Sequence, residues 1–348
     1  MERLVTVGII AKNEEKHIGT ILEQLKNQTY SHDKIEVILV NSMSTDTTKN
    51  IMNSFAKTKE FFGVKIFDNP KQTQASSWNI VIENASGDLI IRLDAHSLIP
   101  KDFVEQNVAC IDSGESVCGG HRVNIISGNG LSEKILLAAE NSMFGSSVAK
   151  YRNDSEDVYV KTIPHACYKK EVFEKCGVFN ENLLRSEDNE MHFRIRQNGY
   201  KIRMSTKIYS EYQTRATLSG MLKQKYGNGK WIGITSMKET PSIFSLYHFV
   251  PLAFVLAAIL ATILLCVSII SWSSLWFLSI PFFAGVLVYA LLDLALSIKG
   301  AKDNGILLAI APLFILFPLL HFSYGFGTLN GIIMAPFMKF NQFKGVKE

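Results

Sequence analysis

Residues 88–97 read Asp-Leu-Ile-Ile-Arg-Leu-Asp-Ala-His-Ser, an apolar run that ends at two potential metal ligands, Asp94 and His96. Side chains alternate between the two faces of a strand, so Asp94 and His96 can point the same way while Ala95 points the other. A carboxylate with an imidazole suits Mn²⁺ or Mg²⁺, and the imidazole favours Mn²⁺. An ordinary surface turn accounts for this spacing equally well, so the rest of the chain must decide between the two.

The first 110 residues alternate apolar, strand-like runs with amphipathic helices. The strands are predicted at residues 4–11, 35–40, 64–67 and 88–94. Near-continuous apolar strands separated by helices indicate an α/β fold with a mostly parallel sheet that is covered on both faces. Ligands bind such sheets at the carboxyl ends of the strands. We therefore expect the loops after the four strands to form one crevice that contains Asp94 and His96.

The last third of the chain is predicted to be a membrane region. Residues 241–292 and residues 304–338 contain no Asp, Glu, Lys or Arg. Each stretch exceeds the roughly 20 residues that cross a bilayer. Two spans are expected, at 247–270 and 275–297, whereas 306–338 forms either a third span or a hairpin.

This pattern predicts two domains, 1–235 and 236–348, joined by a linker near residues 227–245. Lysines follow both the second span and the last stretch, and if both groups stay cytoplasmic the last stretch is a hairpin or a re-entrant segment. The two spans already place the first domain in the cytoplasm. The first apolar run is too short for a secretory signal. The net charge of +4 gives no case for nucleic acid. The five cysteines have no zinc-like spacing, so we expect reduced thiols.

Polar residues follow the predicted strands. Asn41 lies at the tip of the second strand, where its amide can hydrogen-bond a base or a ribose. Lys71 lies near the start of a helix, where backbone N–H groups already favour a phosphate. The neighbouring Ser and Thr residues are equally consistent with ordinary helix caps, and Lys71 with a solvated surface charge.

A second group of charges lies farther along the chain. Residues 185–190, Arg-Ser-Glu-Asp-Asn-Glu, put three carboxylates at the start of a helix. The helix dipole would stabilise Glu187 and Asp188 there, but a general base with a shifted pKa is a second interpretation. Gln224, Lys230 and Trp231 come shortly before the first span, where Lys and Trp also act as interfacial anchors.

The order of these motifs resembles that of the family 2 inverting glycosyltransferases of the GT-A fold. The resemblance covers about residues 4–231, and the membrane tail is typical of members that synthesise polysaccharides. The succinoglycan-synthesis type is most similar, because it has Arg-Leu-Asp-Ala-His, residues 92–96 here, in place of the usual aspartate-x-aspartate.

The resemblance implies roles for individual residues. Asp94 and His96 would hold Mn²⁺ or Mg²⁺ on the diphosphate of a nucleotide-sugar, and Asp188 would be the catalytic base. The remaining substrate-binding residues implied are Ala11, Asn13, Glu14, Asn41, Lys71, Glu187, Gln224, Lys230 and Trp231. Two positions depart from the family pattern: Asn41 stands for the usual Asp, and Lys230 stands for the Arg of a Gln-x-x-Arg-Trp motif, with altered spacing. Lysine keeps the charge but lacks the planar fork of arginine.

The function implied is a membrane-anchored, metal-dependent, inverting transfer of a sugar from a nucleotide-sugar, with UDP-sugars expected, to a lipid-linked or polysaccharide acceptor in exopolysaccharide or cell-surface glycan synthesis. Two alternatives remain. The departures at Asn41 and Lys230 suggest a non-catalytic, nucleotide-sugar-binding membrane subunit. Asp293, inside a predicted span, suggests a small transporter.

Overall fold

The computed structural model describes residues 3–145, 156–271 and 275–341. The chain forms two compact units. The first comprises Met1–Ile125, Ala149–Gln213 and Lys339–Glu348, and the second comprises Ile126–Val148 and Thr214–Met338. The first is an α/β domain, and the described part of the second is helical.

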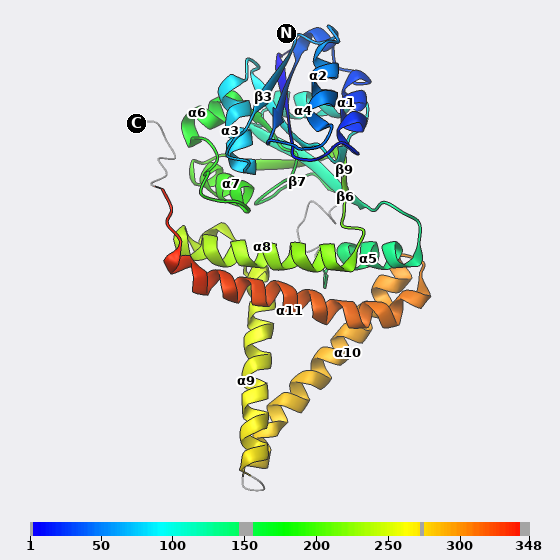
Figure 1. Ribbon diagram of the computed structural model, residues 1–348, viewed down its shortest axis with the longest axis vertical. Coiled ribbons are helices and arrows are strands. Elements are labelled where there is room, and N and C mark those ends of the chain that lie inside the picture. Colours follow the sequence, from blue (N-terminus) through cyan, green and yellow to red (C-terminus); the bar gives the residue numbers. More distant parts are fainter. Residues whose placement is uncertain (1–2, 146–155, 272–274, 342–348) are drawn as a thin grey trace. The chain divides into compact units, whose positions relative to one another are not determined.

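A single mixed sheet forms the centre of the first unit (Figure 1). Its strands are β1 (Val5–Ala11), β2 (Ile35–Asn41), β3 (Gly63–Asp68), β4 (Leu89–Asp94), β5 (Ser97–Leu98), β6 (Val117–Ile125), β7 (Val158–Tyr159), β8 (Cys167–Lys169) and β9 (Ile202–Gln213). The strand order is β3-β2-β1-β4-β8-β6-β9-β5, and β7 pairs with β9. The first four strands are parallel, as predicted, whereas β8 is antiparallel to both of its neighbours.

Helices cover both faces of this sheet. The helices α1 (Ile18–Lys26), α2 (Thr48–Ala56) and α4 (Phe103–Asp112) share one apolar core with the sheet, and α3 (Gln74–Asn84), α6 (Lys170–Cys176) and α7 (Glu187–Gln197) share the other. Strand residues alternate between these cores: Ile9 belongs to the first, and Ile10 to the second. Burial on both faces is the reason that β1 and β2 consist almost entirely of apolar residues.

The register of the parallel strands brings their carboxyl ends to one edge. Ala11 pairs with Asn41, and Asn41 pairs with Asp68. On the other side of β1, Ile10 pairs with Asp94. The predicted convergence of the loops that follow β1 to β4 is therefore confirmed, and Asp94 lies at this edge.

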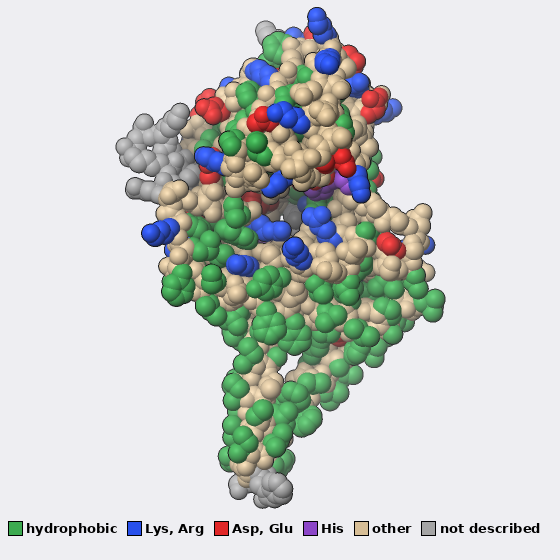
Figure 2. Space-filling model, in the orientation of Figure 1, with side chains coloured by type: hydrophobic (Ala, Val, Ile, Leu, Met, Phe, Trp, Pro, Cys, Tyr) green, Lys and Arg blue, Asp and Glu red, His purple; other side chains and the backbone are tan. Residues whose placement is uncertain are grey.

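The second unit contains α5 (Leu131–Asn141), α8 (Leu218–Lys238), α9 (Val250–Ile270), α10 (Ile280–Asp303) and α11 (Ile310–Met334). Within it, α8 and α11 run side by side, and α9 and α10 diverge from each other toward α11 (Figure 1). Within the ranges that the structure describes, three helical segments are long and apolar enough to cross a membrane: Leu246–Ile270, Trp276–Asp303 and Leu307–Phe337. Apolar side chains cover α9 and α10 (Figure 2).

Glycines hold α8 and α11 together. A Cβ atom on Gly229 or Gly233 of α8 would lie 2.1 Å from the Tyr324 carbonyl oxygen or 2.4 Å from that of Thr328. Gly327 of α11 similarly approaches the backbone of α8. Each helix therefore contributes a Gly-xxx-Gly pair, completed by Gly331 on α11, that lets the two backbones come into contact.

The packing of α8 against α11 bears on two predictions, the linker near residues 227–245 and the stretch 306–338. The sequence pattern assigns residues 227–238 to a linker, but α8 continues through them, because its glycines are stabilised by contact with α11. The stretch 306–338 contains one continuous helix, α11, rather than a hairpin, although Pro318 lies inside it.

Candidate active site

The two predicted metal ligands follow one another at the end of β4. Asp94 is its last residue, and His96 lies in the turn before β5. His96 Nδ1 is 3.0 Å from Glu14 Oε1, and both side chains are 22% exposed. A carboxylate on one imidazole nitrogen fixes the orientation of the ring and directs the other nitrogen to a metal.

The described residues contain no group of three or more His, Cys, Asp or Glu side chains that could hold a metal ion by themselves. Mn²⁺ and Mg²⁺ in phosphate-transferring sites typically take only one or two protein ligands and complete their shell with substrate phosphates and water. Asp94 and His96 fit a site of that open kind, in which a nucleotide diphosphate supplies further oxygens.

A buried histidine that sequence reasoning missed lies against Asp94. His165 Nε2 is 3.5 Å from Asp94 Oδ2 and 2.8 Å from Ser97 Oγ. Its Nδ1 is 2.8 Å from Ser210 Oγ. The side chain is 4% exposed, so every polar atom of the ring is satisfied inside the protein. His165 thereby connects β4, the start of β5 and β9.

The charge of Asp94 is strongly stabilised. Burial alone would raise its pKa, but the His165 hydrogen bond and the charges of His165, His96 and Arg92 outweigh burial and hold the pKa well below its usual range. Burial lowers the pKa of His165 itself, against the opposing effect of Asp94. An ionised carboxylate is the form that a cation requires.

Arg92 is the second residue that sequence reasoning missed. It precedes Asp94 by two positions, so both side chains lie on the same face of β4. The guanidinium carbon lies 4.5 Å from the centre of the Trp78 ring and 4.6 Å from that of Phe179, which is cation–π contact on two sides. Burial alone would lower the pKa of this guanidinium, but the charges of Tyr168 first, and then of Glu187, Asp188 and Asp94, raise it.

The three acids at the start of α7 have different environments. Glu190 forms a two-pronged ion pair with Nε and Nη2 of Arg194. Nη2 also donates to the Val178 carbonyl oxygen and Nη1 to that of Cys176, so Glu190 is structural. Burial, and then the charge of Asp188, raise the pKa of Glu187 to about 8, although Arg92 opposes this. Asp188 is less buried than Glu187, and its Oδ1 accepts from the Asn189 backbone N–H.

The predicted nucleotide-binding residues lie at the same edge. Asn41 is 2% exposed, and its Nδ2 donates to Asp68 Oδ1 at 2.8 Å while its Oδ1 accepts from the Ser44 N–H. A carboxylate thus lies beside Asn41 on β3, at the half-exposed Asp68, which pairs with Lys49. Asp68 could have been found from the sequence, because it directly follows the third predicted strand, 64–67.

The other predicted substrate residues in the first unit are also engaged. Ala11 is buried at the end of β1. The Oδ1 of Asn13 accepts from the Thr45 N–H at 2.8 Å, which joins the loops after β1 and β2. Lys71 is 66% exposed, and its Nζ lies 2.6 Å from Glu181 Oε2. Gln224, Lys230 and Trp231 lie on α8 in the second unit.

Backbone strain concentrates around these residues. The non-glycine residues with positive φ in the described ranges are Asn13, Met43, Gln72, His165 and Ser186. The first three follow β1, β2 and β3, His165 precedes β8 beside Asp94, and Ser186 immediately precedes Glu187. Such conformations cost roughly 1–3 kcal/mol each and cluster at functional sites. They mark this edge of the sheet as the candidate active site independently of side-chain chemistry.

Comparison with known proteins identifies the kind of domain that residues 6–177 form. The Glycosyl transferase family 2 model matches residues 6–177. A dolichyl N-acetyl-alpha-D-glucosaminyl phosphate 3-beta-D-2,3-diacetamido-2,3-dideoxy-beta-D-glucuronosyltransferase of Methanococcus voltae is 26% identical over 273 residues, which cover 77% of this chain and 84% of that protein. The succinoglycan biosynthesis protein ExoA of Rhizobium meliloti is 29% identical over 222 residues, which cover 63% and 66%.

Solved structures share the fold. A mannosyltransferase from Pyrobaculum calidifontis, solved with GDP-Man and Mn²⁺, superposes with a TM-score of 0.58 at 15% identity and covers 94% of this chain and 88% of its own. The likeness at this identity concerns the fold, a mixed, curled α/β sheet of the GT-A type, followed here by three long apolar helices. Residues 6–177 therefore form a domain of glycosyl transferase family 2, and the chain is similar to glycosyltransferases over most of its length.

Proposed function

We propose that this chain is a membrane-anchored, metal-dependent, inverting glycosyltransferase that moves a sugar from a nucleotide-sugar to a lipid-linked or polysaccharide acceptor. One observation carries the proposal: Asp94 ends β4 at the sheet edge where the loops after four parallel strands meet, and His96 follows it in the next turn. Arg92, on the same face of β4 as Asp94, interacts with the acids Glu187 and Asp188 of α7. The names of relatives that act on dolichyl and undecaprenyl phosphates support the lipid-linked acceptor.

We assign the nucleotide-sugar donor to the sheet edge formed by the carboxyl ends of β1 to β4. Asn41 and Asp68 would contact the base, and Asn13, Glu14 and Lys71 would surround the nucleotide. On binding, Lys71 would leave its ion pair with Glu181 and contact a phosphate instead. UDP-sugars remain our expectation. When bound between Asp94 and His96, Mn²⁺ or Mg²⁺ would supply positive charge to the diphosphate leaving group.

The base is assigned to Asp188. Glu187 is buried, whereas Asp188 is partly exposed, so an acceptor hydroxyl can reach Asp188 but not Glu187. Asp188 takes the proton from the acceptor hydroxyl while the hydroxyl oxygen bonds to the anomeric carbon. The bond from that carbon to the diphosphate oxygen breaks on the opposite face, and one displacement inverts the configuration.

We place the amino-terminal domain, residues 1–235 by sequence, in the cytoplasm. The lysines at the end of α10, Lys299 and Lys302, favour that side by the positive-inside rule, because α9 and α10 would cross the bilayer as a pair. An active site in the cytoplasm would have access to soluble nucleotide-sugars, while the apolar helices would keep the enzyme at the bilayer that carries the acceptor.

The test uses the purified full chain with a panel of UDP- and GDP-sugars, Mn²⁺ and a membrane lipid extract. We expect release of nucleoside diphosphate and a glycosylated lipid, both abolished by a chelator. Asp188→Asn should reduce kcat by about 10²- to 10⁴-fold with donor binding retained. Glu83→Gln, which removes an exposed acid of α3, is the control and should be unaffected. Transfer at the wild-type rate by Asp188→Asn would exclude Asp188 as the base.

A further inference from the structure

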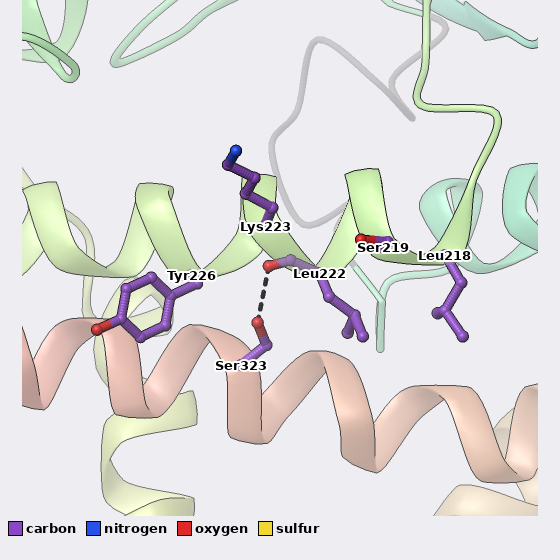
Figure 3. Close-up of a pocket in the computed structure, with 6 residues that line it drawn as sticks. All are labelled: Leu218, Ser219, Leu222, Lys223, Tyr226 and Ser323. Atoms are coloured by element: carbon purple, nitrogen blue, oxygen red, sulfur yellow. Dashed lines mark hydrogen bonds between the residues drawn. The ribbon is translucent and has the colours of Figure 1, made fainter.

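A groove in the second unit runs between α8 and α11. Its lining is Leu218, Ser219, Leu222, Lys223 and Tyr226 from α8 and Ser323 from α11, and its volume is about 690 Å³. Leu222 and Ser323 meet at its floor, where Ser323 Oγ donates to the Leu222 carbonyl oxygen at 2.7 Å (Figure 3). Lys223 points from α8 in the direction away from α11 (Figure 3). The groove thus has an apolar side and one cationic rim.

The groove is continuous with exposed apolar surface on both helices. Leu218 and Tyr226 of α8 are 43% and 38% exposed. On α11, Leu319 and Phe326 are 41% and 44% exposed, and they lie one turn before and about one turn after Ser323. Large exposed apolar side chains in one strip indicate a lipid or a partner rather than water. The neighbouring α9 and α10, which are also covered by apolar side chains, favour lipid.

The charges on α8 select an anionic occupant. Its residues 218–238 include four lysines and no acid. Lys225 is neutralised by Glu140 of α5 at 2.7 Å, and both side chains are buried. Lys223 is exposed and forms no ion pair with any residue in the ranges that the structure describes. An exposed lysine beside an apolar groove complements a phosphate that carries a long hydrocarbon chain.

We propose that this groove binds the acceptor, an isoprenoid lipid whose glycan is attached through phosphate or diphosphate. The chain lies along Leu218, Leu222 and Tyr226, and the phosphate contacts Lys223. The groove holds the first few isoprene units, and the rest of the chain continues into the bilayer. This inference rests on the proposed function for its acceptor class, but the groove and its charge are observed independently of the strand-end site.

Two other lipids fit less well. An uncharged diacylglycerol acceptor leaves Lys223 without a counter-charge. Bulk anionic phospholipid satisfies the lysine but needs no groove, because it binds any exposed cation at the surface about equally. Affinity for the isoprenoid lipid should therefore depend on the groove and on this lysine in particular.

The experiment uses the full chain in phosphatidylcholine nanodiscs, with undecaprenyl phosphate bearing a photoreactive diazirine as the probe. We expect cross-links to map to residues 218–226 and to the neighbourhood of Ser323. Unlabelled undecaprenyl phosphate should compete, whereas phosphatidylglycerol and diacylglycerol should not. Equal competition by phosphatidylglycerol, or cross-links confined to other helices, would overturn the proposal without any variant.

Variants then test the lysine. Lys223→Glu should weaken probe binding by roughly tenfold to thirtyfold, because reversing one charge next to a lipid phosphate changes its electrostatic energy by about twice the contribution of one lysine. Lys223→Arg should stay within about twofold of the parent. Lys302→Glu makes the same charge change at an exposed lysine at the end of α10, outside the groove, and should have no effect. Equal reductions in Lys223→Glu and Lys302→Glu would identify a general surface attraction instead.

The readouts separate this inference from the proposed function. Probe binding needs neither donor nor transfer. If the probe labels the groove but no nucleotide-sugar is consumed, the proposed function fails and the lipid site stands. If transfer proceeds and Lys223→Glu leaves both probe binding and the acceptor KM unchanged, the lipid site fails and the proposed function stands.

Discussion

His165 offers the sharpest test of how the metal site is built. Its ring contacts Asp94, Ser97 and Ser210, and it sits at φ 48°, in the left-handed region. Two substitutions separate the roles of its two ring nitrogens. Asn tolerates the left-handed backbone and places an amide near the position of Nδ1, so it keeps Ser210 but no longer reaches Asp94. Gln is longer and places its amide nitrogen near the position of Nε2.

The size of the effect follows from the hydrogen bond between His165 and Asp94, which Asn cannot form. A hydrogen bond to a charged group contributes about 1.5–3 kcal/mol, which corresponds to roughly 10- to 150-fold in a binding constant. Residues that orient a metal ligand typically change affinity by about 10- to 100-fold. We therefore expect His165→Asn to weaken Mn²⁺ binding by about 10- to 100-fold, and His165→Gln to remain within a few-fold of the parent. Asn also leaves the buried Ser97 hydroxyl with one partner fewer, which costs about 1–3 kcal/mol of stability.

The assay measures free Mn²⁺ by electron paramagnetic resonance in titrations with saturating nucleoside diphosphate and no acceptor. Thermal unfolding of the metal-free variants, followed by circular dichroism, reports folding separately. A purely structural role would lower the unfolding temperature and leave the Mn²⁺ dissociation constant of the folded protein unchanged. Wild-type Mn²⁺ affinity in a folded His165→Asn protein would refute the positioning role.

Two further predictions concern stability. In Gly331→Ala the new Cβ would lie 2.0 Å from the Lys230 carbonyl oxygen. Overpacking typically costs roughly 1–3 kcal/mol, and we expect the α8–α11 pair to be destabilised by at least the upper end of this range. The measurement is limited proteolysis, which should increase within residues 218–334. Gly285→Ala in α10 meets open space and is the control; equal protease resistance of the two variants would contradict the close packing. Burial would raise the pKa of Glu36, but hydrogen bonds from Lys65, Thr6 and Ser86 hold it below the usual 4.5. The ionised Glu36 therefore stabilises the folded state above about pH 5, and this stabilisation is lost as the pH falls through the lower pKa of the folded state. Glu36→Gln should cost about 1–3 kcal/mol in urea unfolding at pH 7 and less near pH 3, and a pH-independent difference would exclude an ionised Glu36 in the folded state.

The fold was largely predictable because its signals are local. Apolar runs such as residues 35–40 and 88–94 can be buried only on both faces, and helices separated by such runs leave few arrangements besides a parallel sheet. The edge occupied by Asp94 followed from that topology. The helix at the end of the chain was harder to predict, because Pro318, Gly325 and Gly327 looked like interruptions, whereas Gly325 is a contact point with α9 and Gly327 with α8.

The candidate active site likewise has features that local sequence predicts and features that depend on contacts between distant residues. Periodicity and spacing along one segment are enough to predict which strand ends carry polar groups and that Glu187 and Asp188 begin a helix. The contacts of Glu14 with His96, of His165 with Asp94 and of Asp68 with Asn41 become visible only when the chain is folded. Those partners are separated by between 27 and 82 residues, so their contacts depend on strand order and register, and no local pattern encodes them.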